Sequence, residues 1–146
     1  MLYSHTSELA IRATRYLASQ PPGKLTPVHE VAAATGMSKA YLSKILRQLI
    51  RSRIVRGIRG PGGGVELGRA PADITLWLVR ESVEGPLGQH RCVLEPRACS
   101  ADSPCALHSR WSPLRADVQR LLEETTLADL VRQVESKESH VVAEQQ

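Results

Sequence analysis

Apolar residues recur every three or four positions in three segments of the N-terminal half of the chain, which predicts three amphipathic helices. The first covers residues 4–19 and ends at a Gln-Pro-Pro-Gly sequence. The second begins after Thr26, its expected N-cap, and stops at Gly36. The third covers residues 39–52, with Ser38 as its N-cap. Two helices joined by a short turn around a glycine indicate a helix-turn-helix.

The pattern changes from helical to extended after the third predicted helix. Residues 54–56 and 65–67 are predicted strands on either side of a glycine-rich segment, residues 57–64, which predicts a hairpin with a long tip. A hairpin that follows a helix-turn-helix is a wing, and glycines at its tip would let the backbone approach DNA closely. A further helix is predicted over residues 74–84.

A second apolar repeat marks the C-terminal part of the chain. Ser103 is expected to cap and Pro104 to open a helix that continues, kinked at Pro113, as one element. Its apolar stripe, at alternating spacings of four and three residues, consists of Leu107, Trp111, Leu114, Val118 and Leu121. Such a stripe predicts a dimer interface, although it could also pack on the core of its own subunit. A last short helix is expected over residues 127–134.

These elements predict a mainly α protein, a winged helix-turn-helix with a C-terminal dimerisation helix. Residues 1–84 would form the DNA-binding domain and residues 85–105 a cysteine-bearing loop. Residues 106–134 would form the dimerisation helices, and the polar residues 135–146 a disordered tail.

Positive charge is concentrated in the first half of the chain. Residues 1–70 contain eleven Lys and Arg against three acidic residues, a net charge of +8, whereas residues 71–146 contain eight against twelve, a net charge of −4. This asymmetry indicates that the first half faces a polyanion, with nucleic acid as the leading candidate. The chain has no apolar run of the roughly 20 residues needed to cross a bilayer, so no membrane partner is expected.

The polar surface of the third predicted helix carries hydroxyl, amide and cationic groups but no carboxylate. This composition suits a major groove flanked by phosphates, whereas a merely solvated helix would mix Glu with Lys. The candidate DNA-binding residues are Ser38, Lys39, Tyr41, Ser43, Lys44, Arg47 and Arg51 on the helix, with Arg59 and Pro61 in the wing. Ser38, Tyr41, Ser43 and Lys44 are expected near base edges, and Arg47, Arg51 and Arg59 on phosphates or in the minor groove.

All three cysteines, Cys92, Cys99 and Cys105, lie in one segment that is interrupted by Pro96 and Pro104. The prolines prevent a single helix, so the segment can fold the three sulfurs toward a common point. The odd number of cysteines and the absence of a secretory signal indicate a reducing, cytoplasmic location, where clustered cysteines favour a metal site over disulfides. The alternative is three unconnected surface thiols.

A fourth ligand would complete such a metal site. His108 lies three residues after Cys105, and the two side chains would share a helical face. Glu8 is a second candidate, provided that the first helix packs against the loop within a subunit or across a dimer, and His90 is a weaker third. Thiolates hold both tetrahedral zinc and iron-sulfur clusters, so the residues alone leave both open.

The chain resembles the IscR/NsrR group of bacterial winged-helix regulators, the Rrf type, over nearly all of its length to about Val134. The motifs that carry this resemblance are GMSKAYLSKILRQL, RGPGGGVEL, the spaced cysteines and TTLADL. The resemblance implies a homodimer that binds palindromic operator DNA and holds an iron-sulfur cluster on its three cysteines. It implies [2Fe-2S] if His108 is the fourth ligand and [4Fe-4S] if Glu8 is, with [2Fe-2S] slightly favoured.

The expected function is therefore that of a transcriptional regulator whose DNA affinity follows the state of the cluster. A structural zinc site of three cysteines and a histidine would keep the fold but remove iron-based sensing. A protein-interaction module is the alternative of another class. No nucleophile-base or carboxylate pair stands out, so neither an enzyme nor a small-molecule substrate is expected.

Overall fold

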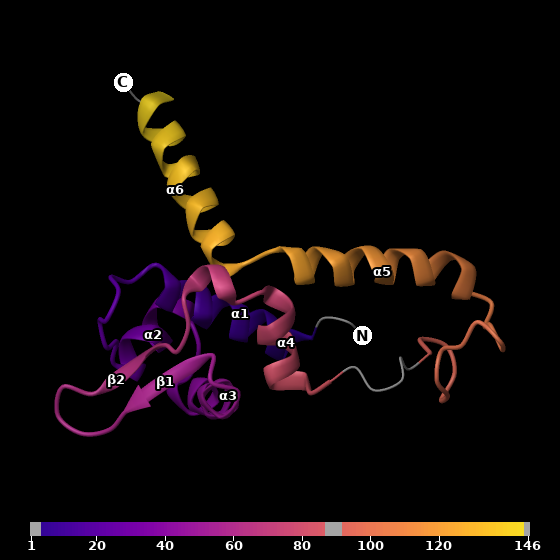
Figure 1. Cartoon of the computed structure of the whole chain (residues 1–146), viewed down its shortest axis with the longest axis horizontal. Coiled ribbons are helices and arrows are strands. Elements are labelled where there is room, and N and C mark those ends of the chain that lie inside the picture. Colours follow the sequence, from indigo (N-terminus) through magenta and orange to yellow (C-terminus); the bar gives the residue numbers. More distant parts are fainter. Residues whose placement is uncertain (1–3, 87–91, 145–146) are drawn as a thin grey trace.

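The fold is mainly α, as the sequence predicts, with one two-stranded antiparallel sheet (Figure 1). The structure is a computed structural model that describes residues 4–86 and 92–144. Its elements in chain order are α1 (His5–Ala18), α2 (Val28–Thr35), α3 (Lys39–Arg51), β1 (Val55–Ile58), β2 (Gly64–Leu67), the 3-10 helix η1 (Pro71–Asp73), α4 (Leu76–Glu84), α5 (His108–Glu124) and α6 (Leu127–Glu144). In the described part of the chain, no helix is long and apolar enough to span a membrane.

The core forms where the apolar faces of α1, α3 and α4 meet. The helical repeats predicted these faces, and Leu42, Ile45 and Leu49 of α3 are at most 1% exposed. Aliphatic side chains fill this core because the chain has no phenylalanine. Burying a side chain of this size contributes about 1.5–3 kcal/mol relative to leaving it in water. The core therefore fixes how α3 is presented to solvent.

One of the two predicted caps in the helix-turn-helix is confirmed and the other is wrong. The Ser38 hydroxyl accepts a hydrogen bond from the Tyr41 backbone N–H, which makes Ser38 the N-cap of α3. Thr26 does not cap α2, because Pro27 occupies the N-cap position and no side chain caps the helix. Thr26 is instead buried in a β-bridge, where it exchanges backbone hydrogen bonds of 2.9 and 2.8 Å with Val65 of β2. The backbone of Thr26 therefore pairs with the wing sheet, and the Thr26 side chain does not cap α2.

Two glycines of the wing have a structural role that differs from the one expected. A side chain at Gly63 would place its Cβ 2.2 Å from the carbonyl oxygen of Ile58, and one at Gly64 would lie 2.5 Å from that of Thr26. Close backbone packing therefore requires both glycines, Gly63 within the hairpin and Gly64 against the segment at Thr26. The two strands are further joined by an ion pair between Arg56 and Glu66, which are direct partners in the register.

The two C-terminal helices differ from their predicted boundaries. α5 begins only at His108, so Ser103, Pro104 and Cys105 precede the helix and the predicted Ser103 cap is wrong; Leu107 takes the N-cap position. The helix then continues through Pro113 to Glu124, as expected for a single element. α6 runs to Glu144, so the prediction of a disordered tail is wrong for residues 135–144. These residues contain no glycine or proline, so nothing breaks the helix.

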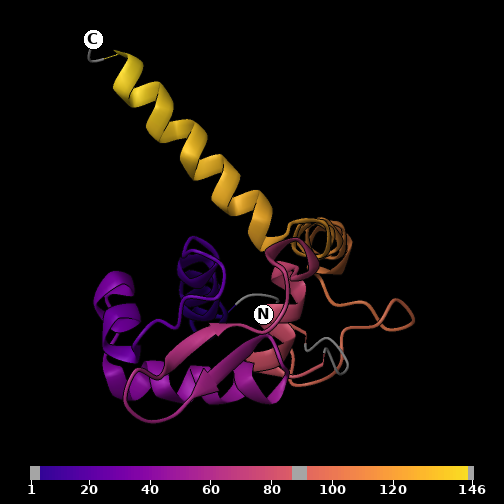
Figure 2. The ribbon, with the colours of Figure 1, turned by 60° about the vertical axis from the view of Figure 1, so that its left-hand side comes forward.

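The junction between α5 and α6 packs against the N-terminal end of α4. Leu122 and Leu127 are buried on either side of the turn, and Thr75 and Thr126 form an isolated β-bridge. From this anchor the two helices diverge: α5 extends toward the cysteine loop, and α6 projects away from the winged helix-turn-helix (Figures 1 and 2). The cysteine loop is therefore bounded by the C-terminal end of α4 and the N-terminal end of α5.

Candidate DNA interface and cysteine centre

The recognition helix α3 presents a cationic surface to solvent. Its exposed cations are Lys39, Lys44, Arg47 and Arg51, and Arg59 is exposed in the wing. Among the residues that the structure describes, none of these five cationic side chains makes a hydrogen bond or an ion pair. Cationic side chains without internal partners are available to phosphates, so the structure is consistent with the predicted contacts of α3 and the wing. Pro61 is likewise exposed at the tip of the wing.

The hydroxyl groups of α3 are engaged within the protein. Ser38 caps the helix, and the Ser43 hydroxyl donates to the Lys39 carbonyl oxygen at 2.8 Å. Tyr41 is half-buried against the core, and its hydroxyl lies 3.0 Å from that of Thr6 on α1. Tyr41, which we expected near base edges, thus has a second role that the sequence did not indicate, because it connects the recognition helix to α1.

A buried charged network joins the start of α1 to the end of α4. The Glu84 carboxylate accepts hydrogen bonds from the backbone and hydroxyl of Ser4 and from the hydroxyl of Ser7. It also pairs with Arg80 at 3.1 Å, and the Arg80 guanidinium lies 5.1 Å from the centre of the Trp77 ring. Burial by itself would raise the pKa of Glu84, but the hydrogen bonds from Ser4 and Ser7 and the Arg80 charge outweigh it, so the pKa lies below its usual range.

The end of α4 that carries this network precedes the cysteine loop in the chain and contacts the recognition helix. Glu84 is the last residue of α4, directly before the segment that leads to Cys92. Its neighbour Val83 accepts a hydrogen bond of 3.4 Å from the Gln48 side chain of α3. The end of α4 therefore contacts both α1 and α3. Arg80 and Glu84 were not selected from the sequence, although opposite charges four residues apart on a helix favour an ion pair.

The four candidate ligands of the cysteine loop form two pairs. The Cys99 sulfur lies 3.2 Å from Nδ1 of His108, whose ring belongs to the first residue of α5. Two ligands of one tetrahedral metal would be separated by roughly 3.5 Å, so this spacing is close to that of a shared ion. The pKa of the Cys92 thiol is lowered by hydrogen bonds from the Leu94 backbone, from the Cys105 side chain and from the Glu95 backbone. The thiols of Cys92 and Cys105 therefore form the second pair.

The pairs differ from the arrangement expected from the sequence. His108 contacts Cys99, because Cys105 precedes the helix instead of sharing a face with His108. Within residues 4–86 and 92–144, no three Cys, His, Asp or Glu side chains form a group that could hold a metal ion, so the three sulfurs do not converge on one point. All three cysteines are half-buried free thiols. Three thiols and an imidazole in one loop nevertheless match, in chemistry, the donors of zinc and iron-sulfur sites.

Glu8 lies on α1 and already has partners there. Its carboxylate pairs with Arg12, one turn further along the helix, and lies 3.4 Å from the His5 ring. These contacts compete with a role of Glu8 as metal ligand. His90, the weaker candidate, lies outside the described residues.

The apolar stripe of α5 is largely exposed. Leu114, Val118 and Leu121 are 57%, 39% and 62% exposed, whereas Leu122, on the neighbouring face, is 5% exposed. Leu107 and Trp111, at the loop end of the stripe, are half-buried. α5 thus packs on its own subunit through one face and leaves a second apolar face uncovered, which is typical of a surface that binds a partner helix.

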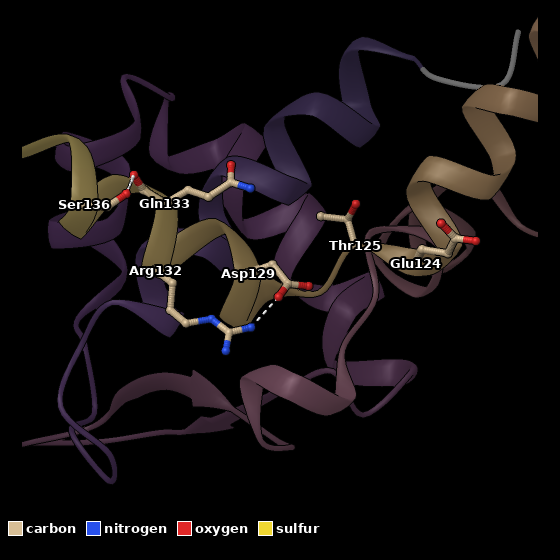
Figure 3. A pocket seen from close by; sticks show the side chains of 6 residues that line it. All are labelled: Glu124, Thr125, Asp129, Arg132, Gln133 and Ser136. Atoms are coloured by element: carbon tan, nitrogen blue, oxygen red, sulfur yellow. Dashed lines mark hydrogen bonds and ion pairs between the residues drawn. The ribbon is translucent and has the colours of Figure 1, made fainter.

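A polar depression lies where α6 leaves α5 (Figure 3). It is lined by Glu124, Thr125, Asp129, Arg132, Gln133 and Ser136. The Asp129 carboxylate accepts hydrogen bonds from the backbone and hydroxyl of Thr126 and pairs with Arg132. These contacts belong to the N-terminal turn of α6, so the depression contains helix-capping groups and no constellation of catalytic residues.

Comparisons with known proteins agree with this architecture. The family model Rrf2, described as an iron-dependent transcriptional regulator, matches residues 3–133. A protein of Aquifex aeolicus that is named as an HTH-type transcriptional regulator is 32% identical over 133 residues, which cover 90% of this chain and 92% of that protein. A protein of Mycobacterium tuberculosis named in the same way is 36% identical over 130 residues, or 89% of this chain and 81% of that protein.

Two solved structures match most of the chain. CymR, the global cysteine regulator of B. subtilis, superposes with a TM-score of 0.73 at 27% identity, over 88% of this chain and 95% of CymR. IscR of T. potens superposes with a TM-score of 0.73 at 23% identity, over 92% of this chain and 88% of IscR. At that identity the likeness to IscR is one of fold. Together these matches confirm the predicted winged-helix class.

Proposed function

Because the chain belongs to the Rrf2 family of transcriptional regulators, which are not enzymes, we propose that an iron-sulfur cluster in its cysteine loop sets its affinity for operator DNA. The observation that carries this proposal is the contact of 3.2 Å between the Cys99 sulfur and Nδ1 of His108, together with the hydrogen bond from Cys105 to the Cys92 thiol. The three thiolates and the imidazole would hold the cluster. When bound, the cluster supplies a centre whose presence or redox state responds to oxidants, nitric oxide or iron supply.

His108 supports a [2Fe-2S] cluster better than Glu8 supports a [4Fe-4S] cluster. The His108 ring already contacts a cysteine at 3.2 Å, whereas the Glu8 carboxylate is engaged by Arg12. A neutral imidazole also adds no negative charge to a site that has three thiolates.

The DNA partner is proposed to be a palindromic operator bound by a homodimer. The exposed stripe of α5 supports self-association, because covering Leu114, Val118 and Leu121 with a second α5 would remove apolar surface from water. A dimer of this kind would place two recognition helices on half-sites about one turn of DNA apart. The cations of α3 and the wing would then contact phosphates on both half-sites.

The route from the loop to DNA is proposed to run through the end of α4. Glu84 connects α4 to Ser4 and Ser7 at the start of α1. On α3, Tyr41 contacts α1, and Gln48 contacts the end of α4. A change in the loop that moves Gly85 would therefore act on the position of the recognition helix.

The test is purification without oxygen, followed by an absorption spectrum and by iron and sulfide analysis. We expect a coloured protein with iron and sulfide, a large loss of both in His108→Ala, and little change in Glu8→Ala. Zinc in a colourless protein would contradict the proposal and support the structural zinc alternative. Operator affinity is then measured with and without the cluster, and equal affinities would refute sensing. A steep decline of operator affinity with salt concentration would argue against a protein-interaction module.

A further inference from the structure

The cysteine loop contains no helix or strand between Cys92 and Leu107 in the described chain, so other contacts must define its shape. Arg97 contributes several of them. Its carbonyl oxygen accepts a hydrogen bond of 2.9 Å from the Cys92 backbone N–H. Its guanidinium donates to the carbonyl oxygen of Ser103 and to the carboxylate of Glu95. One residue therefore connects the position of the first cysteine to a point two residues before the last.

The guanidinium also lies within the electrostatic reach of the thiols. The negative groups whose charges act on Arg97 are Glu95, Cys92 and Cys105. The Arg97 side chain is 35% exposed, so solvent screens part of this charge. The pair with Glu95 offsets another part. The remaining positive charge of Arg97 acts on Cys92 and Cys105, the second pair of candidate ligands.

We propose that Arg97 is a positioning residue of the metal centre, whose guanidinium holds the Cys92 and Cys105 ends of the loop together and offsets the negative charge of their thiolates. This inference rests on the proposed function, because it concerns the same three cysteines. Arginine suits the role better than lysine, because its planar group can donate to the Ser103 carbonyl and to the Glu95 carboxylate at the same time. Both effects stabilise the ligand set without direct bonding to a metal.

Four variants of the full-length protein separate the two effects. Arg97→Gln removes the charge and most of the hydrogen bonds, whereas Arg97→Lys keeps the charge but cannot bridge both acceptors. Glu95→Gln removes the opposing charge. Arg132→Gln is the matched control, because it removes an arginine that pairs with Asp129 on α6, far from the loop (Figure 1). Circular dichroism first establishes that each variant folds, and Arg97→Lys and Glu95→Gln still test the proposal if Arg97→Gln does not.

The first measurement needs no iron. Cd²⁺ is titrated into the reduced, metal-free protein without oxygen, and the ultraviolet absorption of cadmium thiolates reports binding. We expect Arg97→Gln to bind Cd²⁺ about ten- to a hundredfold more weakly than the wild type, as is typical of a lost outer-shell contact. Arg97→Lys should lie between the two, and Arg132→Gln should match the wild type. Wild-type affinity in both Arg97 variants would overturn the positioning role.

The second measurement is the reduction potential of the iron-sulfur protein. Loss of a positive charge makes addition of an electron less favourable, so Arg97→Gln should lower the reduction equilibrium constant about tenfold, or about 59 mV for one electron. Glu95→Gln should shift the potential in the opposite direction, and Arg97→Lys should leave it unchanged. Shifts of the same sign in Arg97→Gln and Glu95→Gln would overturn the charge role. An iron-free wild type would refute the proposed function, and the Cd²⁺ titration would still decide whether Arg97 positions the thiols.

Discussion

Replacement of Glu84 by glutamine would test how strongly the buried network holds α1 to α4. The Arg80 side chain is 4% exposed and the Glu84 side chain 16%, so removal of the carboxylate charge abolishes a largely buried ion pair with an N–O distance of 3.1 Å. Removing one partner of a buried ion pair destabilises a protein by about 3–5 kcal/mol. A glutamine oxygen can still accept hydrogen bonds from Ser4 and Ser7, and the Trp77 ring still faces Arg80. We therefore expect a smaller loss, about 2–4 kcal/mol.

The assay is urea unfolding of the full-length protein, followed by circular dichroism, at pH 7 and at a series of lower values. The pKa of Glu84 is lower in the folded protein than its ordinary value of 4.5, so its stabilising effect is complete above that value. The effect is lost as the pH falls through the lower folded-state pKa. The difference in unfolding free energy between wild type and Glu84→Gln should therefore be largest at pH 7 and shrink in acid.

The matched control is Glu81→Gln, a change of the same chemistry one turn earlier in α4. Glu81 has no ion pair within the described residues, so its replacement should change the unfolding free energy by no more than about 0.5 kcal/mol. Equal unfolding free energies for the two variants at pH 7 would refute the reasoning. A difference between wild type and Glu84→Gln that grows in acid would refute it as well.

Three further predictions concern the dimer, the DNA surface and the wing. Leu121→Asp should convert the protein to a monomer in sedimentation or light scattering, because a charge would enter an apolar contact twice per dimer; an unchanged dimer mass would show that α5 is not the interface. Arg47→Ala should weaken binding to all DNA sequences alike and reduce the slope of affinity against salt by about one, and an effect confined to one operator sequence would contradict phosphate contact. Gly64→Ala should cost about 1–3 kcal/mol or more in urea unfolding, because its Cβ would lie 2.5 Å from the Thr26 carbonyl. In Gly62→Ala, the new Cβ would lie in open space at a positive φ, so the loss of unfolding free energy should be only about 1–2 kcal/mol and smaller than in Gly64→Ala. Equal losses in the two variants would argue against the clash.

The contacts among the metal-site residues could not be predicted from the sequence. The spacing of the cysteines indicated a soft-metal site, but it did not indicate that His108 would contact Cys99 and not Cys105. That partner depends on where α5 begins, and the predicted cap at Ser103 placed the start of the helix too early. Arg97 was not selected either, because its contacts with Ser103 and Glu95 arise from the path of an irregular loop. Loops without regular periodicity give no pattern from which such contacts can be predicted.

The sequence by itself determined which segments form helices, the wing, the cationic surface of α3 and the residue types available for metal binding, but not the start of α5 or the end of α6. These features depend on local periodicity, turn residues and composition, all of which are present in short windows of the chain. Only the tertiary structure decided that Thr26 joins the wing sheet, that Glu84 connects α4 to α1, and that the candidate ligands form pairs. Each of these contacts joins segments that no single window contains, so it follows from how the helices pack around a common core.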